Sequence, residues 1–323
     1  MPRTPLAAGI DIGGTKISAV LTDDGGRRLA FDHVPAPARA GGPAMADAAA
    51  ALVRRLEAEA GVSVGLAGVG AAGVIDQRTG TVVAASATFA DWAGFPLGAA
   101  LAERLGVPVA VDNDVNAFLV GELRWGAAHG QADVLGIMLG TGVGGAIALD
   151  GRLFAGHRGA AGEIGHTPGY GELVCTCGRV GHLETLASGR SIEARYAERT
   201  GAGAPTVRGS EIADRARAGE PEALAVFEAA GRAVGLAASS AASMFDLSFV
   251  VVGGGVRAAW DVLEPAVRAG IDGNPPVSGF PLEVRPAELG ADGVVLGAAA
   301  LAYSDAPHAI PAGASAPTAL VAH

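Results

Sequence analysis

The stretch GIDIGGTKISAVLTDDGGR (residues 9–27) follows a plan that returns later in the chain as IMLGTGVGGAIALDGR (residues 137–152). Each copy runs from an apolar strand through a turn of glycine and threonine into a second apolar strand and an Asp-Gly turn. We interpret the pair as one β-hairpin used twice. Backbone N–H groups of such a turn form a concavity that suits a phosphate oxygen, and glycine permits close approach. A hairpin without a ligand would explain either copy alone, but two copies favour phosphate binding.

Strand and helix patterns alternate through the rest of the chain and predict an α/β fold. We expect Ser210 and Pro221 to mark helix starts, and Gly106, Gly219 and Gly270 to end helices. Apolar runs of strand length cover residues 6–12, 16–22, 62–69, 107–111, 134–139 and 249–252, and helical patterns cover residues 44–60, 97–105, 115–125, 210–218, 221–244 and 258–269. The Ala/Pro-rich stretch at residues 304–323 predicts a disordered tail.

Composition excludes several classes of protein. The 323 residues are 50% hydrophobic and carry a formal net charge of -10, which suits globular cores and would repel a nucleic-acid backbone. The N-terminal residues 1–16 do not form a secretory signal, and the apolar window at residues 224–244 is interrupted by Glu228 and Arg232. We therefore expect a cytoplasmic protein without nucleic-acid or membrane partners.

Two nucleotide-binding glycine motifs of other folds do not fit. The second hairpin contains G-x-G-x-x-G at Gly140, Gly142 and Gly145. The dinucleotide-binding motif requires a helix to begin there, whereas this sequence soon turns at Asp150-Gly151. The P-loop pattern G-x-x-x-x-G-K-[S/T] does not occur in the sequence. The patterns therefore favour neither a nicotinamide-dependent enzyme nor a P-loop NTPase.

A third glycine cluster, at Gly253, Gly254 and Gly255, lies where a buried strand ends and a helix begins. Such a turn brings the backbone close to a nucleotide, although alone it would be no more than a tight connection. Because three glycine clusters follow three strands, a nucleotide site is the better interpretation.

The polar run Asp112-Asn113-Asp114 follows a β-branched strand and precedes a helix. Asp and Asn are preferred N-cap residues, so capping accounts for one of the three. Side chains at the carboxyl end of a strand in an open α/β sheet lie where ligands bind. We therefore predict that one of these carboxylates accepts a proton from a hydroxyl nucleophile.

Seven motifs of this chain resemble, in order and spacing, the ROK family of bacterial sugar kinases. They are DIGGTK (11–16), GAAGVID (70–76), VDNDVNA (111–117), LGTGVGGA (139–146), AGEIGH (161–166), CTCGRVGHLE (175–184) and VVGGGV (251–256). The resemblance covers residues 9–303 and implies an α/β actin-like ATPase (ribonuclease H-like) fold with two lobes and a central cleft. It implies a small lobe at residues 1–118, rejoined by a C-terminal helix at 291–303, and a large lobe at 119–290 that carries a zinc site and nucleotide-binding elements.

The resemblance also implies ATP-dependent phosphorylation of a hexose at its 6-hydroxyl, with glucose converted to glucose 6-phosphate. Asp114 would be the general base, and Asp11 would help to place Mg²⁺. The nucleotide would bind Asp11, Gly13, Gly14, Thr15, Lys16, Thr141, Gly142, Gly253, Gly254 and Gly255, and the sugar would bind Gly73, Thr88, Asn113, Asp114, Glu163, His166 and Glu184.

The only two cysteines of the chain, Cys175 and Cys177, stand between His166 and His182 within seventeen residues. Cysteines at this spacing do not form an unstrained disulfide. The family implies a structural zinc ion held by one histidine and three cysteines, and His182 stands where most members have the third cysteine. Two histidines and two cysteines also suit tetrahedral zinc. We expect the metal to fix the neighbouring glutamates at the sugar and to leave nucleotide affinity nearly unchanged.

Two departures from the family pattern bear on the substrate. The usual Gly-x-Pro-Gly is GAAG at residues 70–73, and the usual Pro-Asn is missing from SATFADW (86–92), where Thr88 stands in for the asparagine. Both lie near the part of the site that contacts C2 and C3 of the sugar in the family. Glucose is the first expectation. N-acetylmannosamine or another N-acetylhexosamine is the alternative, because ASGRSI (187–192) and residues 290–302 also resemble acylmannosamine kinases.

ROK repressors carry a helix-turn-helix segment upstream of this region, and because DIGGTK begins here at Asp11 we do not expect this chain to be one of them. Two further alternatives stay open. A non-catalytic sugar-binding regulator is disfavoured only by Asp114 and the two phosphate turns. Inorganic polyphosphate is an alternative donor to ATP. The family resemblance also implies a homo-oligomer, either a dimer or a tetramer.

Overall fold

The computed structural model describes residues 4–201 and 207–304, which belong to two compact units. The first unit consists of Met1–Gly126, Ala155–Ala160 and Asp292–His323, and the second of Ala127–Phe154 and Ala161–Ala291. The lobe boundary expected after residue 118 falls inside helix α3 (Asp114–Trp125), which lies whole in the first unit. The expected tail, apart from Ser304, lies outside the described residues.

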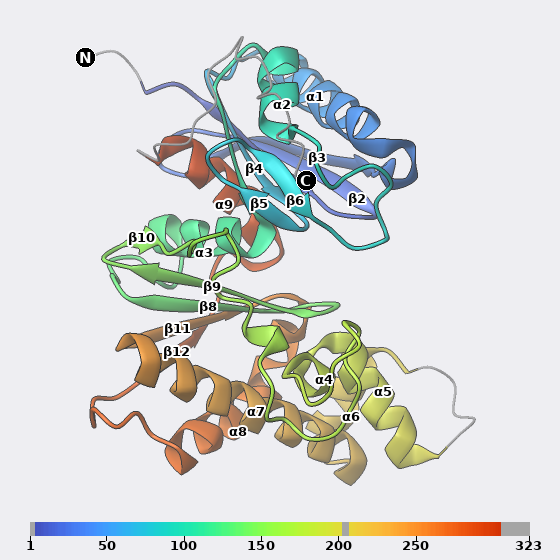
Figure 1. Ribbon diagram of the computed structural model, residues 1–323, viewed down its shortest axis with the longest axis vertical. Helices are drawn as coiled ribbons and strands as arrows, with labels where there is room; N and C mark the ends of the chain where they lie inside the picture. The colour runs from blue at the N-terminus through green and yellow to red at the C-terminus, as the bar shows by residue number, and fades with distance from the viewer. Residues whose placement is uncertain (1–3, 202–206, 305–323) are drawn as a thin grey trace, which may run out of the picture. The chain divides into compact units, whose positions relative to one another are not determined.

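The first unit is built on a five-stranded sheet of order β3-β2-β1-β4-β7. Strands β2, β3 and β4 of this sheet are labelled in Figure 1. Strands β1 (Ala7–Ile12), β2 (Lys16–Thr22) and β3 (Arg28–Pro35) are antiparallel, and β4 (Leu66–Ala71) and β7 (Val109–Asn113) continue from β1 in parallel. Helices α1 (Gly41–Ala60) and α2 (Leu97–Leu105) share one apolar core with the sheet. A separate hairpin of β5 (Val74–Asp76) and β6 (Thr81–Ala84) follows β4.

Glycines in the sheet let helix α9 (Gly293–Tyr303) pack against its backbone. A Cβ atom at Gly9 of β1 would overlap the carbonyl oxygen of Val295, and one at Gly68 of β4 would overlap that of Ala298. Helix and strands therefore approach each other more closely than any residue with a side chain would allow. The C-terminal helix joins the first unit by this contact.

The second unit has a five-stranded sheet of order β10-β9-β8-β11-β12. Its strands are β8 (Val134–Leu139), β9 (Val143–Leu149), β10 (Arg152–Leu153), β11 (Phe249–Gly253) and β12 (Glu283–Pro286), and they pair in the same directions as the strands of the first sheet. The repeat seen in the two hairpins thus extends to the whole sheet. One core joins this sheet to α4 (Glu184–Ala187), α5 (Gly189–Thr200), α6 (Gly209–Arg217), α7 (Pro221–Phe245) and α8 (Trp260–Gly273).

Helix ends match the sequence signals in part. Pro221 is the first residue of α7, and Gly106 follows α2 in the left-handed conformation with φ 68°. Ser210 does not cap α6, because that helix already begins after Arg208. Gly270 does not end α8 but lies inside it, where a Cβ atom would come within 3.1 Å of the Gly235 Cα atom of α7. This glycine therefore serves close helix packing.

Between residues 4 and 304, leaving out the undescribed 202–206, none of the helices combines the length and the apolar character that crossing a membrane would need.

Candidate active site and metal centre

The predicted catalytic residues lie where β7 meets α3. Asn113 is the N-cap of α3, since its Oδ1 atom accepts a hydrogen bond from the Val115 N–H at 2.8 Å. Its Nδ2 atom donates to the Gly73 carbonyl oxygen at 2.9 Å, so two of the predicted sugar ligands are in contact. Asp114 is the first residue of α3 and is half-buried. Capping therefore accounts for Asn113 and leaves two carboxylates to explain.

Asp114 acts electrostatically on Asp11 of β1. Burial is the main cause that raises the pKa of Asp11 to about 7, the charge of Asp114 raises it further, and Lys16 opposes both. A divalent cation would stabilise the ionised form of Asp11 beside the charge of Asp114, because carboxylate oxygens are suitable ligands for Mg²⁺. The residues present therefore fit the magnesium ion implied by the family.

The first glycine turn, between β1 and β2, is closed by a 3.0 Å hydrogen bond from the Gly13 N–H to the Lys16 carbonyl oxygen. A Cβ atom at Gly14 would lie 2.8 Å from Cγ2 of Thr88, so this threonine lies against the turn. Thr15 and Lys16 are exposed. Gly14 does not have a left-handed φ. Glycine is therefore required at this position because a side chain would collide with Thr88, and not because of the backbone conformation.

The second glycine turn, between β8 and β9, contacts the loop that carries the cysteines. Oε2 of buried Glu184 accepts a hydrogen bond from the Val143 N–H at 3.1 Å, and its Oε1 accepts one from Oγ1 of Thr176 at 2.7 Å. A Cβ atom at Gly142 would overlap Glu184 Oε2. One carboxylate thus joins the two segments. The loop that carries the predicted metal ligands therefore contacts the second glycine turn, although the two are separate in sequence.

Gly255 of the third glycine cluster lines a cavity of about 780 Å³ in the second unit, together with Gly140 and Thr141 of the second turn. Gly254 has φ +86°, and a Cβ atom there would overlap the Leu139 carbonyl oxygen at the end of β8, so only glycine fits. Gly253 is the buried last residue of β11, and Gly255 begins the short helix η3 (Gly255–Ala259). The cavity has an apolar wall formed by Ile192, Ala213, Phe227, Val256, Ala258 and Ala259.

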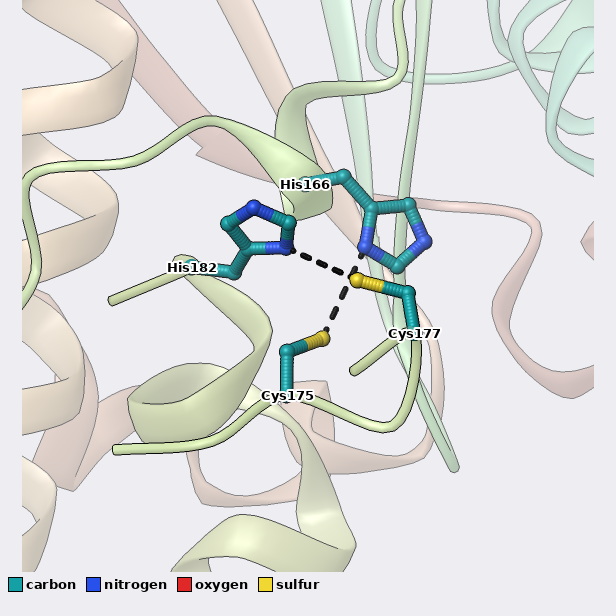
Figure 2. Close-up of side chains that lie close together, drawn as sticks. All are labelled: His166, Cys175, Cys177 and His182. Carbon is teal, nitrogen blue, oxygen red and sulfur yellow. Dashed lines mark hydrogen bonds between the residues drawn. The ribbon is translucent and has the colours of Figure 1, made fainter. Parts of the chain in front are cut away.

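The two histidines and two cysteines converge on one point, as Figure 2 shows. Their ligand atoms all lie within 4.8 Å of one another. The Sγ atom of Cys175 is 3.7 Å from Nδ1 of His166, and the Sγ atom of Cys177 is 3.3 Å from Nδ1 of His182. His166 ends the short helix η2 (Ile164–His166), and exposed Glu163 immediately precedes it.

The cluster fits tetrahedral zinc in both donor type and spacing. Zinc bonds of about 2.3 Å to sulfur and 2.0 Å to nitrogen at tetrahedral angles place S and N about 3.5 Å apart, close to the two separations here. Burial raises the pKa of the Cys175 thiol, whereas a bound metal would hold it as thiolate. With zinc bound, these four side chains would supply all four ligands of a tetrahedral site.

Sequence reasoning missed three contributors. Helix α5, which lines the cavity, has a readable start, because Ser188 is its N-cap and accepts a 3.1 Å hydrogen bond from the Ser191 N–H. Thr176 and Gln77 carry no such signal. Thr176 contacts Glu184, eight residues away, and Gln77 contacts Asp112, 35 residues away; neither contact follows from a local sequence pattern.

Two sheets of the same order, each beginning with a hairpin whose turn is rich in glycine, define an actin-like ATPase fold. The chain belongs to the ROK family, whose model matches residues 7–305. It is 36% identical to a glucokinase from Streptomyces coelicolor over 94% of this chain and 99% of that protein.

Two further relatives extend the comparison. The crystal structure of a ROK family glucokinase from Streptomyces griseus in complex with glucose and AMPPNP is 35% identical, with a TM-score of 0.78, and the match covers 92% of this chain and 99% of that one. An N-acetyl-D-glucosamine kinase from Haemophilus influenzae is 30% identical over 91% of this chain and 98% of that protein. The expected actin-like fold is therefore confirmed.

Proposed function

We propose that this protein transfers the γ-phosphoryl group of ATP to the 6-hydroxyl of glucose. The observation that carries the proposal is the 36% identity to a glucokinase over nearly the full length of both chains. The residues at the β7–α3 junction are consistent with this reaction. Asp114, at the start of α3, is a carboxylate close enough to Asp11 to raise its pKa.

In the first unit, we assign Asp114 as the general base that accepts the proton of the attacking hydroxyl. Phosphoryl transfer otherwise requires positioning and charge neutralisation. Asp11 would hold Mg²⁺, whose charge would offset that of the phosphates, and the turn of Gly13, Gly14, Thr15 and Lys16 would bind phosphate oxygens. Asn113 uses one of its two Nδ2 hydrogens on Gly73. The other would serve a sugar hydroxyl.

In the second unit, Thr141 and Gly142 would bind phosphate, and Gly253, Gly254 and Gly255 would line the nucleotide site. We assign Glu163, His166 and Glu184 to sugar hydroxyls, since carboxylates and imidazoles pair with such groups. A zinc ion held by His166, Cys175, Cys177 and His182 would fix the loop that presents these residues. Its role would be structural, because the protein supplies all four ligands.

The cavity beside the second turn is lined by Arg190, Arg208 and Arg217 as well as by apolar side chains. This mixture suits ATP, because a planar base gains from the apolar wall and guanidinium groups suit phosphates. Ser210 lines this cavity at the start of α6. We expect Ser210→Trp to raise the KM for ATP about tenfold and to leave the KM for glucose unchanged. Steady-state kinetics with each substrate varied in turn test this, and an unaltered KM for ATP would count against the cavity as the base site.

Neighbouring glycines of the second turn allow a paired test. A Cβ atom at Gly140 would meet nothing closer than the Gly142 carbonyl oxygen at 4.0 Å, whereas one at Gly142 would displace Glu184. We expect Gly140→Ala to raise the KM for ATP while the melting temperature and glucose affinity stay at wild-type values. Gly142→Ala should weaken glucose binding as well. Calorimetric titration of both ligands distinguishes the two, and unchanged ATP binding in Gly140→Ala would contradict the phosphate assignment.

A second candidate is phosphorylation of N-acetyl-D-glucosamine, favoured by the 30% identity to the Haemophilus influenzae kinase. A panel of hexoses and N-acetylhexosamines with ATP or polyphosphate, followed by coupled product detection, tests both candidates. We expect the highest kcat/KM with glucose and ATP. Tight glucose binding without phosphate transfer would instead indicate a non-catalytic regulator.

A further inference from the structure

The roles assigned so far leave several buried carboxylates without a function, namely Glu57, Asp112 and Glu122. Asp112 is the one that lies nearest to the catalytic run in sequence. Asp112, only 4% exposed, lies two residues before the proposed base. Its Oδ1 atom accepts hydrogen bonds from Nδ2 of Asn116 and from the Asn113 N–H, both at 2.7 Å. Its Oδ2 atom accepts one from Nε2 of Gln77, also at 2.7 Å. All three partners donate, so the arrangement suits an ionised carboxylate.

Gln77 comes from the β5–β6 hairpin and directly follows β5. Gly73, directly before β5, accepts the hydrogen bond from Asn113. The two ends of β5 therefore hold two consecutive residues at the end of β7. Of these two hydrogen bonds, Gln77–Asp112 and Asn113–Gly73, only the first involves a buried carboxylate. An unpaired buried carboxylate oxygen is costly, so this hydrogen bond constrains the geometry strongly.

We propose that Gln77 is a positioning residue: through the Asp112 carboxylate it holds the β5–β6 hairpin against the catalytic end of β7. This inference rests on the proposed function, since it concerns the placement of Asn113 and Asp114. Burial, opposed by the hydrogen bonds from Asn116, Asn113 and Gln77, raises the pKa of Asp112 to about 6. At pH 8 the carboxylate is ionised and depends on its three donors.

The first test replaces Gln77 with a side chain of similar size that cannot donate. Gln77→Leu should lower kcat/KM for the sugar about 10- to 100-fold, the usual effect of losing a hydrogen bond to a buried charge. Arg78→Ala is the matched control, because the neighbouring Arg78 is exposed and its ion pair with Asp76, 3.5 Å long, lies at the surface. We expect wild-type kinetics from the control.

The second test makes the contact dependent on pH. In Gln77→Glu two carboxylates face each other, and one proton can bridge them at low pH but not at high pH. Relative to wild type, kcat/KM should fall by about tenfold or more between pH 6 and pH 8. Asp11, whose pKa is raised to about 7 mainly by burial, lies two strands away and titrates in this range. Asp11, Asp76, Arg78 and Asp114 are present in both proteins, so comparison with wild type removes their contribution.

The decisive variant exchanges the two groups. Gln77→Glu combined with Asp112→Asn lets the new amide donate to the new carboxylate, and it keeps an oxygen for the Asn116 side chain and the Asn113 N–H. We expect the double variant to recover most of the activity that Gln77→Glu loses at pH 8. A Gln77→Glu protein with the wild-type pH profile, or a double variant no more active at pH 8 than Gln77→Glu, would overturn the proposal.

Thermal unfolding separates this inference from the proposed function. The melting temperature of Gln77→Glu, taken relative to wild type, should fall from pH 6 to pH 8, and the double exchange should remove that fall. If wild type phosphorylates no sugar but this pattern appears, the contact stands and the kinase assignment fails. If wild type is an active kinase and the pattern is absent, the positioning role fails.

Discussion

Asp114→Asn should lower turnover by about 10²- to 10⁴-fold while glucose still binds, because the amide cannot accept the proton of the attacking hydroxyl. Asparagine keeps the size of the side chain and an oxygen that can accept the 3.0 Å hydrogen bond made by the Val115 N–H. The start of α3 is therefore preserved. Single-turnover kinetics and glucose titration would be measured side by side.

The charge of Asp114 supplies an independent readout. Because Asp114 raises the pKa of Asp11, its removal should lower that pKa. A raised carboxyl pKa means that the stability contributed by protonated Asp11 is present at low pH and is lost as the pH rises through about 7. Asp114→Asn should therefore be at least as stable as wild type at pH 8.

Loss of activity in Asp114→Asn would thus not come from unfolding. Asp47→Asn, on the exposed side of α1 with Arg104 as its partner at 2.6 Å, is the control and should behave as wild type. Near-normal turnover in Asp114→Asn would refute the assignment of the base. An inactive protein that also fails to bind glucose would show that the aspartate binds the sugar instead of activating it.

The sequence predicted the architecture where local signals agree with the tertiary structure. Strands β2 and β8 and helix α2 have the predicted limits, because each is a continuous apolar or amphipathic run between turn residues. The repeated hairpin predicted the antiparallel pairs β1–β2 and β8–β9, and the structure adds that each pair belongs to a sheet of the same order. Gly270 shows the limit of such reasoning: a glycine that looks like a helix stop serves the contact between α7 and α8, which the sequence does not display.

The candidate site also contains contacts that the sequence predicts and contacts that it does not. The convergence of His166, Cys175, Cys177 and His182 was predictable, since the four residues lie close together in sequence. The hydrogen bonds from Val143 to Glu184 and from Gln77 to Asp112 were not, because they join segments 41 and 35 residues apart. Such contacts depend on how strands and loops pack, and no periodicity or turn signal encodes them.

The second large effect concerns the proposed metal. We expect one zinc ion per chain in the wild-type protein, and its loss in His182→Ala, because a tetrahedral structural site needs all four ligands. His182 is buried and its Nδ1 atom faces Cys177. His182→Cys should retain zinc, since thiolate is an equally suitable ligand. His129→Ala, which removes an exposed histidine from the same unit, is the control and should keep the metal.

Loss of zinc should weaken the binding of both substrates, ATP as well as the sugar. The loop carries Thr176, whose hydroxyl holds Glu184, and Glu184 in turn accepts the hydrogen bond from the second glycine turn. Without the metal this carboxylate loses its fixed position, so glucose affinity should fall by about tenfold or more and ATP affinity should fall as well. Elemental analysis and calorimetric titration of both ligands measure these effects independently of turnover. A His182→Ala protein that keeps its zinc would exclude this histidine as a ligand, and a zinc-free variant with normal ATP affinity would show that Glu184 does not transmit the order of the loop to the turn.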